Sequence, residues 1–70
     1  MKWLTEPSPA NMKVLNAFAR LESKLGMTPS AARTGRELGM NIGVCHYHFR
    51  MLERMGFMKK VEGHWVRVRR

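Results

Sequence analysis

NIGVCHYHFRMLERMG, residues Asn41 to Gly56, carries the helical pattern on which the rest of the predicted fold depends. Wound at about 100° per residue, it separates into an apolar face and a polar face, as an amphipathic helix does. The face that we expect to meet the core carries Ile42, Cys45, Phe49, Leu52 and Gly56. The opposite face carries Gly43, Tyr47, Arg50 and Arg54. Asn41 can cap the first turn and Gly56 can adopt the left-handed conformation that ends a helix, so the stretch predicts a self-contained helix.

A first helix is expected well upstream of this stretch. Ser8 and Pro9 form a cap followed by a proline at the first helical position, and the apolar period continues to about Lys24, with Gly26 as the stop. The expected core stripe of this helix is Val14, Phe18, Leu21 and Leu25. We interpret it as scaffold rather than as a membrane-binding helix, because its polar side is only mildly basic.

A second, shorter helix is expected between these two. Thr28 and Pro29 repeat the cap-then-proline signal, and the helix would run roughly from Ser30 to Leu38. Its inward positions would be Ala31, Thr34, Gly35 and Leu38. The small Gly35 allows the following helix to cross closely, and residues 39–41 (Gly-Met-Asn) predict a tight turn into it. Two helices joined this tightly form a helix-turn-helix.

Beyond residue 56 the apolar pattern changes to that of strands. The runs FMKKV (57–61) and HWVRV (64–68) are rich in β-branched and aromatic residues, and the Glu-Gly pair between them is a hairpin turn signal. A two-residue loop pairs Val61 with His64, whereas a three-residue loop pairs Val61 with Trp65. We favour the second register because it turns both later valines and Met58 inward and leaves Lys59 and Arg67 together outside. Trp65 is expected to cover the core side of the hairpin.

Charge limits the classes of partner. Thirteen lysines and arginines against five acidic residues give a formal net charge of +8 over 70 residues. From residue 50 onward only Glu53 and Glu62 oppose a cluster of cations, which is Arg50, Arg54, Lys59, Lys60, Arg67, Arg69 and Arg70. Such clustering is typical of proteins that bind a polyanion such as nucleic acid.

The length predicts one domain, residues 1–70. Within the leader, Trp3 and Leu4 are apolar enough to be expected to pack back on that domain. Cys45 has no second cysteine to pair with and suits a reducing cytoplasm. We see neither the apolar segment of a signal peptide nor a run of about 20 apolar residues, so we expect a cytoplasmic protein without a membrane partner.

Metal binding, catalysis and cofactors are not expected. Cys45, His46 and His48 crowd into four helical residues that point in different directions and cannot close a tetrahedral site. The chain has no aspartate, no nucleophile-base pair and no phosphate-cradling glycine loop. The sequence therefore indicates a binding protein rather than an enzyme.

The elements together resemble the winged helix-turn-helix, and the similarity is greatest to the DNA-binding domain of LexA-type repressors. In that family the first helix ends in Gly, and Pro with Thr or Ser comes next. A Leu-Gly turn follows, and then a helix that closes on the pattern His-Leu-x-x-Leu-x-x-x-Gly-aromatic-aliphatic. The matching positions here are Gly26, Pro29-Ser30, Leu38-Gly39 and His48-Phe49 through Gly56-Phe57-Met58, with Leu4-Thr5 also similar. The turn before the third helix is shorter than in the family, and the sequence contains no match to the self-cleaving dimerisation domain, so autoproteolysis is not carried over.

The resemblance implies that the third helix lies in the major groove and that the hairpin wing lies over the DNA backbone or the adjacent minor groove. By position it implies that the base-facing residues are Asn41, Gly43, Val44, His46 and Tyr47. Helix geometry adds Arg50, whose guanidinium group matches the guanine edge. The residues expected at the backbone are Thr28, Ser30, Arg54, Lys59, Lys60, His64, Arg67 and Arg69.

We therefore expect a mainly α domain with a small β-hairpin, a winged helix-turn-helix of three helices plus a C-terminal wing. Its expected function is sequence-specific binding of double-stranded DNA as a small transcriptional regulator, such as a repressor of a phage or mobile element. Because one helix reads only a few base pairs, a homodimer on a two-fold site is expected. The alternative is an interaction module that binds an acidic protein partner of the transcription or replication machinery; a binder of non-B-form nucleic acid is a further one.

Overall fold

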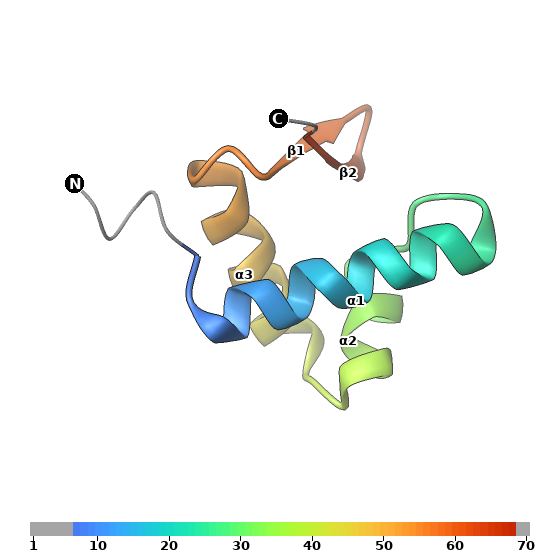
Figure 1. Ribbon diagram of the computed structural model, residues 1–70, viewed down its shortest axis with the longest axis horizontal. Coiled ribbons are helices and arrows are strands. Elements are labelled where there is room, and N and C mark those ends of the chain that lie inside the picture. The colour runs from blue at the N-terminus through green and yellow to red at the C-terminus, as the bar shows by residue number, and fades with distance from the viewer. Residues whose placement is uncertain (1–6, 69–70) are drawn as a thin grey trace.

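The computed structural model describes residues 7–68, which form three helices followed by a two-stranded antiparallel hairpin (Figure 1). The elements are α1 (Pro9–Leu25), α2 (Ala31–Leu38), α3 (Ile42–Arg54), β1 (Met58–Val61) and β2 (His64–Arg67). Helix α1 crosses α3, and the hairpin packs beside α3 (Figure 1). The fold is the predicted one, mainly α with a C-terminal β-hairpin wing. The expectations for Trp3, Leu4, Leu4-Thr5, Arg69 and Arg70 lie outside the described residues.

Each helix begins at a side chain that accepts a backbone hydrogen bond. Ser8 Oγ accepts from the N–H of residue 11 at 3.1 Å, and Ser30 Oγ accepts from the N–H of residue 33 at 3.1 Å. Asn41 Oδ1 accepts from the N–H of residue 43 at 2.7 Å. The cap predicted at Thr28 is wrong: the N-cap is Ser30, two residues later, and Pro29 is buried just before it. The Ser30 hydroxyl satisfies a first-turn N–H group that no backbone acceptor reaches.

The core lies between one face of each helix and the inward face of the hairpin. The rings of Phe18 and Phe49 meet edge to face at 5.6 Å between centroids, and those of Phe49 and Trp65 do so at 5.3 Å. Around these rings lie the buried side chains of Val14, Ala31, Cys45, Leu52 and Met58. Since Phe49 contacts both α1 and the wing, the middle of α3 is the centre of the core.

Three residues expected in the core lie at its edge. Leu25 is 42 % exposed and Ile42 is 54 % exposed, because each occupies the terminal turn of its helix, which extends past the neighbouring elements. Gly56 is exposed and adopts a left-handed φ of 85°, which confirms its expected role in ending the helix. Periodicity assigns a face to a residue, but burial also requires a neighbouring element opposite it.

The turn between α2 and α3 depends on a close backbone approach. A Cβ atom on Gly35 would lie 2.8 Å from the carbonyl oxygen of Met40 and 3.4 Å from the Cβ atom of Cys45. Gly39, with a φ of 65°, ends α2. The predicted crossing at Gly35 is confirmed, and this crossing sets the direction in which α3 leaves the turn.

The hairpin has the register that we did not favour. Val61 pairs with His64 across a two-residue loop whose residues, Glu62 and Gly63, have φ values of 50° and 81°. Two positive φ values are typical of the type I′ turn, whose twist matches that of the strands. The inward face therefore carries Met58, Lys60, Trp65 and Arg67. This register buries the indole ring against Phe49, which removes more apolar surface from water than burial of two valines would.

No helix within residues 7–68 combines the length and the apolar character needed to cross a lipid bilayer.

Candidate nucleic-acid interface

The face of α3 that points away from the core is open to solvent, as predicted. Gly43, Tyr47, Arg50 and Arg54 are all exposed, and Tyr47 keeps 60 % of its surface. Within residues 7–68 neither guanidinium group of this face makes an ion pair or a hydrogen bond. This face therefore presents the phenol ring of Tyr47 and the unpaired guanidinium groups of Arg50 and Arg54 from one helix.

The remaining residues predicted to face the bases lie at the start of α3 and differ in their exposure to solvent. Val44 is 48 % exposed, and Asn41 is exposed while its amide oxygen caps the helix. The side-chain amide nitrogen of Asn41 is the group left for an outside acceptor. His46 is only half-buried and lies at the border with the wing.

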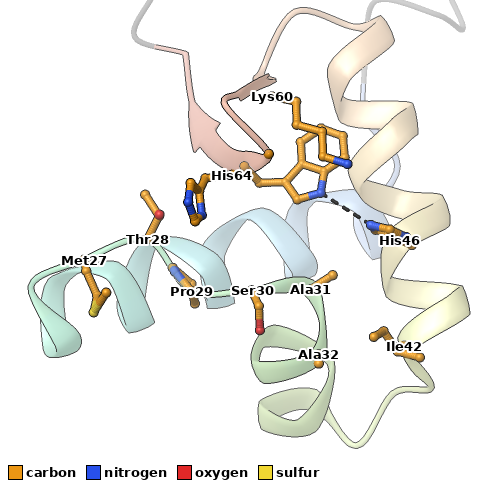
Figure 2. Close-up of a pocket in the computed structure, with 12 residues that line it drawn as sticks. Met27, Thr28, Pro29, Ser30, Ala31, Ala32, Ile42, His46, Lys60 and His64 are labelled. Atoms are coloured by element: carbon orange, nitrogen blue, oxygen red, sulfur yellow. Dashed lines mark hydrogen bonds between the residues drawn. The ribbon is translucent and has the colours of Figure 1, made fainter.

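His46 is a contact between α3 and the wing. The indole N–H of Trp65 donates to His46 Nε2 at 3.5 Å, and the two rings meet edge to face at 6.1 Å (Figure 2). Lys60 Nζ lies 5.4 Å from the centroid of the same indole ring, a cation–π geometry. These contacts attach the hairpin to α3, and they occupy the His46 nitrogen that a base would otherwise meet.

A hollow of about 600 Å³ separates the start of α2 from the wing (Figure 2). Figure 2 shows Thr28 and Ser30 on one side of it, His64 and Lys60 on the other, and Ile42 and His46 at its end. The structure thus brings together five predicted contact residues that are up to 36 positions apart: Thr28, Ser30, His46, Lys60 and His64.

A second hollow, of about 370 Å³, lies between α3 and the wing. Tyr47, Arg50 and Arg54 line it from α3, and Lys60 lines it from β1. Glu53 is the acidic group among the residues that line it. Because Lys60 and Trp65 line both hollows, they form the wall between them. Three cationic side chains from two elements therefore surround the second hollow.

The predicted pairing of Lys59 and Arg67 on the outer face is wrong. Lys59 is exposed on the outer face of β1, opposite Val66. Arg67 instead lies on the inward face, where its Nε donates to Glu22 Oε1 of α1 at 2.8 Å. The register explains the difference, since a shift of one residue moves every side chain of a strand to the other face. Of the predicted backbone-contacting set, Arg67 already has a carboxylate partner and Arg69 lies outside the described residues.

One contact that positions α3 was not anticipated. His48 Nδ1 lies 2.8 Å from Asn11 Oδ1, and because an amide oxygen only accepts, the imidazole N–H donates. Asn11 is 4 % exposed although the helical pattern places it among the polar residues of α1. The pairs Asn11–His48 and Glu22–Arg67 join residues 37 and 45 positions apart, so no local pattern could have predicted either one.

The Cys45 side chain lies in the core. It is buried beneath α2, and burial raises the pKa of the thiol above its ordinary value of 9.0. No three His, Cys, Asp or Glu side chains converge on a metal-sized site anywhere in the described part of the chain.

No protein-family model, no curated protein and no solved structure matches this chain. The function must therefore be inferred from the sequence motifs, the geometry and the charge of the chain itself.

Proposed function

We propose that this chain binds double-stranded DNA in a sequence-specific manner and regulates transcription, with α3 in the major groove and the hairpin over the phosphate backbone. The observation that carries the proposal is the placement of the wing beside the open face of α3. Around the hollow between them lie the unpaired guanidinium groups of Arg50 and Arg54 and the ammonium group of Lys60. A helix with such a flank can place side chains on base edges while the neighbouring cations hold the phosphates.

The dimensions of α3 fit this placement. Its 13 residues extend for about 20 Å, at 1.5 Å per residue. A helix with its side chains is about 10–12 Å across, close to the roughly 12 Å width of the major groove. Tyr47 and Arg50 lie in the middle of this length, so they would face the floor of the groove when the helix enters it.

The charge at the tip of the hairpin favours the backbone position of the wing over the minor groove. Glu62 occupies the turn, and a carboxylate would be repelled between the closely spaced phosphates of the narrow groove. Lys59 lies on the outer face behind the tip, from which it can reach the outer side of a DNA strand, and His64 lines the hollow toward the start of α2. The contacts to His46 and Glu22 hold this surface in place before DNA arrives.

The resemblance to LexA-type repressors supports a regulatory role and a two-fold arrangement on DNA. A homodimer would place two copies of α3 about one helical turn apart and would supply the specificity that one helix lacks. We place the protein in the cytoplasm, where a lone buried thiol such as that of Cys45 stays reduced.

Selection of bound sequences from a random duplex pool, followed by affinity titration, tests this proposal. We expect a preferred sequence in the form of an inverted repeat, and an affinity that falls by orders of magnitude between 50 and 200 mM salt. Arg50→Ala should cost about 1–3 kcal/mol on the preferred duplex and little on a scrambled one. Lys59→Ala should weaken both duplexes alike and reduce the salt slope by about 1.

Two matched controls lie on α1. Arg20→Ala and Lys24→Ala remove exposed cations that line a separate hollow beside Glu37, so they should change the affinity for DNA much less. If Arg50→Ala and Lys59→Ala have no more effect than these controls, the DNA-binding proposal fails. Binding of an acidic protein partner would then be the better interpretation of the charge.

A further inference from the structure

Two side chains on the open face of α3 form a small apolar patch. Val44 is 48 % exposed and Tyr47 is 60 % exposed, and they lie three residues apart, which makes them neighbours on a helix surface. A valine in a helix has essentially one side-chain rotamer. The Tyr47 ring meets the His48 ring edge to face at 5.5 Å, which limits its movement. The patch is therefore a preorganised surface.

The surroundings of the patch identify the kind of surface that it fits. Arg50 continues the same row three residues further on, and Arg54 follows one turn later. An apolar patch beside unpaired cations is poorly suited to the same face of a second copy, because that copy would bring its own Arg50 and Arg54 guanidinium groups close to these. It suits a polyanion that exposes apolar groups among its polar ones.

In the major groove the apolar group at the base edges is the C5-methyl group of thymine. We infer that Val44 and Tyr47 bind thymine methyl groups in the major groove, with Arg50 on a nearby guanine. This inference depends on the proposed DNA-binding function and names the base chemistry that the helix reads.

Spacing along the helix sets the expected pattern. Residues three apart rise about 4.5 Å along a helix axis, whereas neighbouring base pairs are about 3.4 Å apart. Val44 and Tyr47 therefore span neighbouring base pairs, and Arg50 lies about 9 Å from the start of the row. The preferred site should contain one or two thymines within about three base pairs of a guanine.

Replacement of thymine by uracil tests the inference, because uracil lacks only the methyl group. In the duplex obtained by selection, each thymine is replaced in turn and the dissociation constant is measured. One or two replacements should weaken binding about fourfold each, the value for one buried methyl group. Val44→Ala should lower the affinity for the thymine duplex and make binding indifferent to at least one of these replacements.

Val61→Ala is the matched control. Val61 is a valine of similar exposure, 44 %, but it lies on the outer face of the wing. This variant should keep the full sensitivity to uracil. Alanine is a strong helix former and Val44 is not in the core, so circular dichroism of Val44→Ala should match that of the unaltered chain.

The inference fails, and the proposed function still stands, if the selected site contains no thymine or if no uracil replacement in that site changes affinity. A dimer that dissociates on Val44→Ala would also overturn it, because the patch would then be a contact between copies. Failure to select any duplex, together with no binding at low salt, would instead overturn the proposed function.

Discussion

Substitution of Gly35 by alanine should destabilise the protein, although alanine is the better helix former. In an open helix interior the exchange gains about 1 kcal/mol. Here the new Cβ atom would lie 2.8 Å from the carbonyl oxygen of Met40, a backbone atom that cannot swing away as a side chain can. The Met40 N–H also donates to the Gly35 carbonyl at 2.7 Å, so the whole turn between α2 and α3 would have to move.

The magnitude follows from these opposing effects. Overpacking of a tight site costs about 1–3 kcal/mol, and the upper end applies because the obstacle is backbone. After the gain in helix propensity, we expect a net loss of about 2 kcal/mol. For a domain of this size that is a large part of the total stability and should lower the melting temperature by about 8–16 °C.

Urea unfolding followed by circular dichroism measures this loss, and Gly43→Ala is its control. At Gly43 the nearest atom to a new Cβ atom is the Asn41 side-chain oxygen, at 3.1 Å. Disturbance of that cap costs about 1 kcal/mol and offsets a similar gain in propensity, so stability should barely change. A Gly35→Ala protein as stable as the Gly43→Ala protein would refute the close crossing of α2 and α3.

Two further predictions concern the buried residues next to the interface. Trp65→Ala should cost about 3–5 kcal/mol and leave the domain largely unfolded in a thermal melt. Trp65→Phe should keep the contact with Phe49 and lose only about 1 kcal/mol, because it lacks the hydrogen bond to His46. Equal melting temperatures of the alanine variant and the unaltered chain would contradict the position of the wing. Burial raises the pKa of the Cys45 thiol above 9.0, so the folded state keeps a proton that the unfolded chain releases. The contribution of this thiol to stability is complete below about pH 9 and falls as the pH rises further. The free energy of unfolding, measured with urea at about pH 8 and about pH 10, should therefore differ less between the two pH values in Cys45→Ala than in the unaltered chain. An equal difference in both proteins would mean that the thiol is accessible to water.

The contacts around the wing bear on affinity as well as on stability. A short hairpin is marginally stable alone, and here Trp65 and Arg67 attach it to α3 and α1. The Glu22–Arg67 pair is partly exposed and contributes at most about 1 kcal/mol, so the buried indole is the main support. A wing held in this way loses little conformational freedom on binding, which leaves more of the contact energy for affinity.

Local chemistry predicted much of the architecture and of the open face of α3. Ser8, Ser30 and Asn41 are side chains that satisfy first-turn N–H groups, and the glycines at 26, 39 and 56 adopt the left-handed conformation that other residues avoid. The exposure of Tyr47 and Arg50 follows from helical periodicity once Phe49 and Leu52 face the core. These properties depend on neighbours within about one turn, so the sequence is sufficient to determine them.

Tertiary packing decided the rest. The hairpin register depended on whether Trp65 or a pair of valines meets Phe49, a choice between residues far apart in the chain. That choice turned Arg67 toward Glu22 and brought the indole to His46, which changed the role expected of each. In the same way, helical periodicity places Leu25 and Ile42 on the faces that meet the core, but both side chains are exposed because no element lies opposite them. Local sequence is sufficient to specify the helices and the polarity of their faces. Which side chains remain free for a ligand depends instead on partners that folding brings together across the domain.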